Sequence, residues 1–225
     1  MAQSAGERRR IGVDEAGKGD YFGPLVVAGV YVDEESEGAL SALGVKDSKL
    51  LSDSRVRSLA QEIRRASPHA IVAVGPARYN TLRESMGNLN RMLAWGHARV
   101  IENLLEQVEC PNVIADQFGD ARYLESALMG RGRTVRLTQR PRAEADIAVA
   151  AASVVARAEF LRRLQELSAR YGLELPKGAG PAVITAGAEL VRRHGEAALN
   201  EAAKVHFRTT QAVLAAVKKT PGGAG

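Results

Sequence analysis

Carboxylates stand at three points of the chain that border an apolar run. Asp14 and Glu15 are adjacent in the stretch IGVDEAGKGDYFG, between an apolar run and a glycine-rich turn. Asp116 ends a second apolar run, NVIAD, and Glu144 and Asp146 precede an alanine-rich stretch. A carboxylate at the end of a buried strand costs free energy unless it is paired or holds a cation. These acids are therefore candidates for one acidic site assembled from distant parts of the sequence.

The residue types indicate which chemistry such a site could perform. Converging carboxylates repel and raise one another's pKa unless cations neutralise them. Oxygen ligands without nearby cysteine or histidine suit Mg²⁺ or Mn²⁺ rather than zinc. Two such ions about 4 Å apart could activate water and stabilise the leaving oxygen of a phosphodiester. A solvated turn edge is the alternative reading of Asp14 and Glu15, and a helix cap or surface residue that of Asp116.

The pattern around these acids predicts an α/β protein with a mixed five-stranded sheet flanked by helices and a C-terminal helical segment. Short apolar runs predict strands, and period-3.6 spacing predicts helices. The glycine turn after the first run predicts a hairpin. The expected strands are 10–16, 25–32, 71–75, 112–116 and 134–137. The expected helices are 52–65, 88–108, 120–129, 147–171 and two more after the loop LELPKGAGP.

Composition limits the class of protein. The 225 residues are 45% hydrophobic and only 4% aromatic, which predicts a core of small and aliphatic side chains. We expect one domain over residues 10–215 between disordered tails at 1–9 and 216–225. The single cysteine, Cys110, excludes an internal disulfide and a cysteine-rich zinc site. No secretory signal or membrane-length apolar stretch is evident, so we expect a cytoplasmic protein without membrane association.

Ordered motifs resemble one known family. The stretch GVDEAGKGDYFGPLVVAGV is similar to the first-strand signature of the type 2 ribonucleases H, the HII and HIII group. VKDSKLLSD and AVAAASVVAR are similar to that group's next motif and to its alanine-rich helix. The matching motifs run from residue 10 to about residue 210. The resemblance implies a ribonuclease H-like fold.

Further motifs resemble the HIII branch. The triplet GKG leads into DYF, and YN, NLNRMLAWGHARVI, DQF and KVHFRTT are similar to ribonuclease HIII segments. Proteins of that branch usually carry an extra N-terminal substrate-binding domain of TATA-binding-protein-like fold. Only about ten residues precede the first expected strand, so we expect a short form of the family or a trimmed chain.

The resemblance implies endonucleolytic cleavage of the RNA strand of RNA–DNA hybrids with Mg²⁺ or Mn²⁺, leaving 3′-hydroxyl and 5′-phosphate ends. The family's catalytic and metal-binding acids map onto Asp14, Glu15, Asp116 and Glu144. Asp146 is the alternative fourth acid, because the spacing to the alanine run is one residue shorter than the family pattern. The family's substrate contacts map onto Gly17, Lys18, Gly19, Lys46, Ser48 and Lys49. A plain hairpin turn and a charged loop before a helix are the structural alternatives for these two groups.

Other functions remain open at this stage. One is HII-like excision of single ribonucleotides from DNA, although no tyrosine follows Tyr171 to act at an RNA–DNA junction. Another is a non-catalytic nucleic-acid-binding domain, which the net charge of +5 permits without proving. A metal-dependent DNA nuclease on a similar fold is disfavoured by the GKG and DSK motifs. We expect a monomer, and we expect His97 to be a packed, hydrogen-bonded histidine rather than a ligand.

Overall fold

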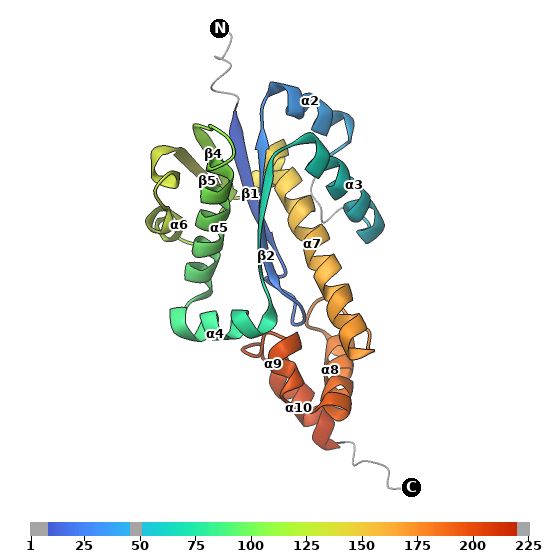
Figure 1. Ribbon diagram of the computed structural model, residues 1–225. Coiled ribbons are helices and arrows are strands. Elements are labelled where there is room, and N and C mark those ends of the chain that lie inside the picture. The colour runs from blue at the N-terminus through green and yellow to red at the C-terminus, as the bar shows by residue number, and fades with distance from the viewer. Residues whose placement is uncertain (1–8, 46–50, 220–225) are drawn as a thin grey trace. The chain divides into compact units, whose positions relative to one another are not determined.

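The computed structural model describes residues 9–45 and 51–219 (Figure 1). Five strands form one sheet in the order β3-β2-β1-β4-β5. β1 pairs antiparallel with β2 and parallel with β4, and β4 pairs parallel with β5. The predicted mixed five-stranded sheet flanked by helices is confirmed. The strands are β1 (Arg10–Ala16), β2 (Leu25–Val32), β3 (His69–Val74), β4 (Asn112–Asp116) and β5 (Arg136–Arg140).

Helices precede, separate and follow the later strands. The α-helices before β5 are α2 (Glu34–Ala42), α3 (Asp53–Ala66), α4 (Pro76–Met86), α5 (Leu89–Leu105) and α6 (Arg122–Ala127). Those after β5 are α7 (Ile147–Tyr171), α8 (Pro181–His194), α9 (Ala198–Ala202) and α10 (Thr209–Lys219). Two 3-10 helices are η2 (Gly132–Thr134) and η3 (Ala143–Ala145).

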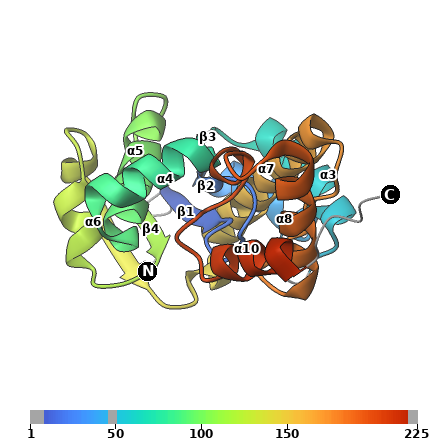
Figure 2. The ribbon, with the colours of Figure 1, turned by 90° about the horizontal axis from the view of Figure 1, so that it is seen from below.

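The chain forms two compact units. The first contains residues 9–16, Val26–Ala73 and Met86–Glu159, and the second contains Gly17–Leu25, Val74–Ser85 and residues 160–219. In the second unit α8 packs against α10 (Figure 2), where Val213 lies close to Gly187. The chain passes between the units several times, so neither is a separate run of sequence. A single domain over 10–215 and a monomeric state both stay predictions.

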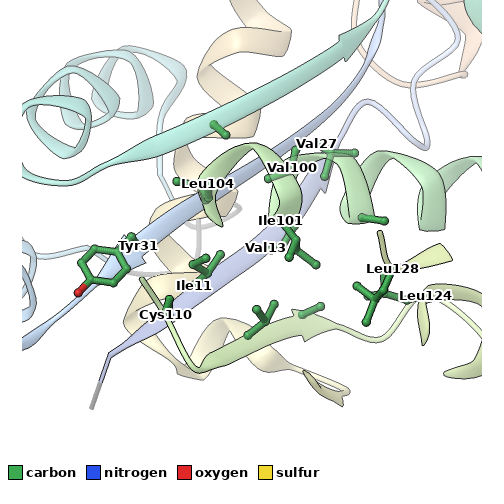
Figure 3. Packing of buried hydrophobic residues seen from close by; sticks show 14 residues of the cluster. Ile11, Val13, Val27, Tyr31, Val100, Ile101, Leu104, Cys110, Leu124 and Leu128 are labelled. Carbon is green, nitrogen blue, oxygen red and sulfur yellow. The ribbon is translucent and has the colours of Figure 1, made fainter. Parts of the chain in front are cut away.

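The main hydrophobic cluster of the first unit lies on one face of the sheet. Ile11 and Val13 of β1 pack there against Val100, Ile101 and Leu104 of α5 (Figure 3). Successive strand residues point to opposite faces, so the odd-numbered positions of β1 face α5. Burial of this aliphatic cluster fixes β1 against the helix and thereby fixes the direction of each β1 side chain.

The opposite face of β1 lies against the alanine-rich start of α7. A Cβ at Gly12 would lie 2.1 Å from the carbonyl carbon of Ala148, so only glycine fits there. Ala148, Ala150, Ala151 and Ala152 are fully or almost fully buried. Small side chains let the helix approach the sheet closely.

Several predicted bounds are wrong. β5 begins two residues later and ends three residues later than predicted, since its polar, alternating RLTQR carries no apolar run. α2 and α4 are missing from the prediction, although Asp33 forms a capping box with Ser36 and Pro76 starts α4. Three helices, not two, follow the LELPKGAGP loop, and α10 continues past residue 215 to Lys219. Residues 1–8 and 220–225 of the expected tails lie outside the described residues.

None of the helices in the described ranges combines the length and the apolar character needed to cross a membrane.

Candidate active site

β1 directs its two acids to opposite faces of the sheet. Glu15 shares the face of Val13, towards α5, and its Oε2 lies 3.0 Å from Nε2 of His97. Asp14 shares the face of Gly12, towards α7, where it makes a side-chain hydrogen bond with Ser153. The backbone N–H of Glu15 also donates to Asp14 Oδ1 at 2.8 Å. Both carboxylates are thus fixed by hydrogen bonds to neighbouring elements.

Asp116 lies beside Asp14 on the neighbouring strand. β1 and β4 run parallel, and their register pairs Val13 with Ala115, one residue before each acid. Val13 and Ala115 both belong to the cluster that faces α5, so Asp14 and Asp116 both follow onto the α7 face. The parallel pairing therefore brings together two acids that are about a hundred residues apart in sequence.

Glu144 is positioned through Asp116. The backbone N–H of Ala143, in η3, donates to Asp116 Oδ1 at 3.1 Å, and Glu144 is the next residue. Arg142, which precedes η3, has a left-handed backbone, at φ 56°. The chain turns here after β5, and the hydrogen bond to Asp116 links η3 to the end of β4.

Asp146 has a different environment. Its two oxygens accept from Nε of Arg10 at 3.0 and 2.9 Å, and Oδ1 accepts from the backbone N–H of Ala148 at 2.9 Å. It therefore anchors the first strand and the start of α7. The alternative fourth acid is bonded to structural groups, whereas Glu144 is half-buried and follows Ala143, whose N–H binds Asp116.

The electrostatics of Asp14 indicate an uncompensated charge. Burial, and next the negative charge of Glu15, raise the pKa of Asp14 to about 7, against smaller opposing effects of its hydrogen bonds and of His97. Such a group is stabilised by a cation, and carboxylate oxygens are the donors that Mg²⁺ and Mn²⁺ prefer. The donor set thus fits a hard divalent ion.

The four acids do not form a closed ligand set. Across residues 9–45 and 51–219, no three His, Cys, Asp or Glu side chains are arranged to hold a metal ion. The structure brings Asp14, Asp116 and the segment of Glu144 to one face of the sheet. Glu15 leaves β1 on the α5 face, one residue before the strand ends, and its Oε2 is bonded to His97.

Comparisons with known proteins agree with this geometry. The family model for "Ribonuclease HII" matches residues 11–210. The ribonuclease HIII of Protochlamydia amoebophila (strain UWE25) is 48% identical over 209 residues, which are 93% of this chain and 69% of that protein. The chain belongs to the type 2 ribonuclease H family. It is therefore a ribonuclease H enzyme, and its relatives bear the HIII name.

Further relatives of this ribonuclease H have the same name or the same fold. The ribonuclease HIII of Chlamydia pneumoniae is 43% identical over 205 residues, 90% of this chain and 69% of that protein. The solved structure of Bst-RNase HIII in complex with Mn²⁺ superposes with a TM-score of 0.89 at 38% identity, covering 96% of this chain and 72% of that one. The ribonuclease H2 of Pyrococcus horikoshii OT3 shares the fold, with a TM-score of 0.79 at 22% identity, covering 94% of this chain and 100% of that one.

The expected substrate contacts of this ribonuclease H lie in the second unit or outside the described residues. Gly17 has φ +86°, and a Cβ there would lie 2.2 Å from the carbonyl oxygen of Pro24, so the turn requires glycine. Gly19 faces open space and Lys18 is half-buried. Three of the predicted contacts lie outside the described residues: Lys46, Ser48 and Lys49.

Two residues that stabilise this part of the ribonuclease H were not predicted. Lys204 is fully buried, and its Nζ donates to the carbonyl oxygens of Asp20 and Gly23 at 2.8 and 2.7 Å. The side-chain amide of Asn80 donates to the carbonyl oxygen of Ala203 at 2.9 Å, and its Oδ1 accepts from the N–H of Val205 at 3.1 Å. Both residues stand in motifs that resemble the HIII branch, YN and KVHFRTT, and this resemblance was the only indication in the sequence that they matter.

Proposed function

We propose that this ribonuclease H is an endoribonuclease that hydrolyses the RNA strand of RNA–DNA hybrids. The reaction is a phosphodiester hydrolysis with two divalent ions, Mg²⁺ or Mn²⁺, and it leaves 3′-hydroxyl and 5′-phosphate ends. The observation that carries this proposal is the placement of Asp14 and Asp116 on one face of neighbouring strands, with η3 bonded to Asp116. The Mn²⁺ complex of the Bst relative supports the choice of metal.

The candidate ligands are the four acids Asp14, Glu15, Asp116 and Glu144. When bound, divalent ions supply the positive charge that activates water and stabilises the leaving oxygen. The chain's own contribution is to hold the carboxylates in place before the ions arrive. Asp14 is held by the N–H of Glu15 and by Ser153, and Asp116 is held by the N–H of Ala143. Preorganised oxygens bind cations with little loss of side-chain entropy.

Glu144 is the preferred fourth acid over Asp146. Asp146 already accepts hydrogen bonds from Arg10 and from the start of α7, and losing them would remove one carboxylate partner of a largely buried guanidinium. Glu144 has a half-buried side chain, and it follows the residue that binds Asp116. Within the described ranges its carboxylate makes no hydrogen bond that must break before it binds a cation.

The glycine turn is the proposed element for recognising RNA. It follows Glu15 within two residues, and glycines at 17 and 19 let backbone N–H groups approach a ribose or phosphate. The 2′-hydroxyl distinguishes RNA from DNA, and it lies in the wide minor groove of an A-like duplex. Lys18 would add a positive charge for the phosphates, and the residues Lys46, Ser48 and Lys49 are proposed as further contacts.

Cleavage of defined duplexes tests the proposal. The protein is incubated in Mg²⁺ or Mn²⁺ with labelled RNA–DNA, DNA–DNA and RNA–RNA duplexes, and with DNA that contains one ribonucleotide. We expect fast cleavage of the RNA strand of the hybrid, slow cleavage at the single ribonucleotide, and no cleavage of the DNA–DNA and RNA–RNA duplexes. Equal cutting of DNA–DNA would refute the proposal. Faster cutting at the single ribonucleotide than in the long hybrid would favour the HII-like alternative.

A further inference from the structure

His97 and Glu15 form a buried pair on the α5 face of the sheet. The His97 side chain is completely buried, and that of Glu15 is only 11% exposed. Nε2 of His97 lies 3.0 Å from Glu15 Oε2. An ionised carboxylate can only accept, so Nε2 carries the proton and donates it in this hydrogen bond. The histidine thus fixes one oxygen of an acid that the proposed function assigns to the metal site.

The bond to Glu15 is the only hydrogen bond that the imidazole ring makes within the described ranges. The other ring nitrogen, Nδ1, is also buried and has no hydrogen-bond partner among these residues. The polar contacts of the ring are therefore directed at Glu15 alone.

Two packing contacts fix the imidazole ring. The ring lies against Phe118, with centroids 4.7 Å apart and an angle of 55° between the planes. Phe118 stands two residues after Asp116, so the imidazole ring also contacts the segment that follows Asp116. The neighbouring Gly96 lets α5 approach β2, since a Cβ there would lie 2.9 Å from Cγ2 of Val27. The close approach places His97 within hydrogen-bonding distance of Glu15.

We propose that His97 is a positioning residue for the metal site: it donates from Nε2 to Glu15 and sets the direction of that carboxylate. The inference rests on the proposed function, because Glu15 is assigned there as a metal ligand. Outer partners that hydrogen-bond metal-binding carboxylates typically change metal affinity by 10- to 100-fold. The role is separate from packing, since a side chain of similar size without a donor would fill the space and remove the hydrogen bond to Glu15 Oε2.

Three variants separate the positioning of Glu15 from the packing of the His97 ring. His97→Gln keeps a donor nitrogen near the position of Nε2, and His97→Leu keeps bulk without a donor. Leu104→Ala truncates a buried residue of the same helix that contacts the core and not the acids. The measurements are the Mn²⁺ dissociation constant by electron paramagnetic resonance, kcat and KM on an RNA–DNA hybrid, and the thermal midpoint. The imidazole ¹⁵N shifts of the unaltered protein report the tautomer.

The expected result is that His97→Leu weakens Mn²⁺ binding about 10- to 100-fold and lowers kcat, with a smaller change in KM. His97→Gln should restore most of the affinity, and Leu104→Ala should lower the midpoint while Mn²⁺ affinity changes less than about twofold. Unchanged Mn²⁺ affinity in folded His97→Leu, or an Nε2 that carries no proton, would overturn the inference. If the unaltered protein binds Mn²⁺ but does not cleave hybrids, the proposed function fails while the metal-binding comparison still decides the role of His97.

Discussion

Nε of Arg10, at the start of β1, donates to both carboxylate oxygens of Asp146, at 3.0 and 2.9 Å. Both side chains are largely buried, with 14% and 13% exposed, so the pair joins the first strand to the start of α7. An acid used in this way is a structural partner. The neighbouring Glu144 has no such bond among the described contacts and follows the residue that binds Asp116.

The first prediction separates these two acids. Glu144→Gln should lower kcat by about a hundredfold or more, with an unchanged thermal midpoint, because it removes a charge from the metal site. Asp146→Asn should cost about 1 to 3 kcal/mol of unfolding free energy, since Arg10 loses a charged partner, while the folded protein keeps most of its activity. Urea denaturation and hybrid cleavage measure both. The reverse pattern, with an inactive but stable Asp146→Asn, would make Asp146 the fourth acid.

The second prediction concerns Asp14. Asp14→Asn should reduce turnover by about a thousandfold or more, because the carboxylate is a proposed metal ligand. Without divalent ions the variant should be as stable as the unaltered protein or more stable, by roughly 1 kcal/mol, since a charge disfavoured by burial and by Glu15 is gone. Thermal midpoints with EDTA and with Mn²⁺ give the test: Mn²⁺ should raise the midpoint of the unaltered protein only. An active variant would remove Asp14 from the site.

Much of this arrangement follows from local sequence. α7 begins and ends as predicted, because its alanine-rich first half and its later period-3.6 spacing point to one helix. Asp14 and Asp116 were located by the apolar runs that they end, and the parallel register then places them side by side. Such acids can be recognised from sequence because a carboxylate at the end of a buried strand is costly unless it is paired or binds a cation.

The remaining features depend on contacts between distant residues. Strand alternation predicts that Asp14 and Glu15 face opposite sides of the sheet, but it does not predict which residue Glu15 contacts there. Its partner His97 is 82 positions away in the sequence, and no local pattern connects the two. The sequence around Lys204 does not predict that this lysine is buried, because its partners, the carbonyl oxygens of Asp20 and Gly23, are distant in the sequence. β5 was misplaced because its polar strand pairs at the sheet edge, where no apolar period is needed.

The third prediction concerns the buried Lys204. Burial lowers the pKa of its ammonium from 10.5 to about 7, although the charge of nearby Asp20 opposes this. Its Nζ also lies 5.5 Å from the ring centre of Tyr79. Between about pH 7 and pH 10.5 the unfolded chain binds a proton here that the native protein lacks. The free energy of unfolding should therefore rise with pH across this window, by up to about 1.4 kcal/mol per pH unit.

The comparison with Lys204→Met isolates this contribution. Urea denaturation at pH 7, 8 and 9 should show a stability gain in the unaltered protein that is missing in Lys204→Met. The exposed Lys218 gives the control, since Lys218→Met should follow the unaltered protein in parallel. A Lys204→Met curve that also runs parallel would mean that Lys204 keeps its charge in the native protein throughout this range.

The last prediction tests the close approach of β1 and α7. Gly12→Ala should cost about 3 kcal/mol or more, because the added Cβ would lie 2.1 Å from the carbonyl carbon of Ala148 and 2.2 Å from the backbone nitrogen of Val149. Backbone atoms of a packed helix cannot move aside as the end of a side chain can, so β1 must shift and carry Asp14 with it. Gly38→Ala is the matched control, since no atom lies within 4 Å of its added Cβ in the exposed helix α2, where alanine should stabilise by up to about 1 kcal/mol. Urea denaturation of the two variants measures the difference, and a Gly12→Ala protein as stable as the unaltered one would contradict the tight contact that places Asp14 on the α7 face.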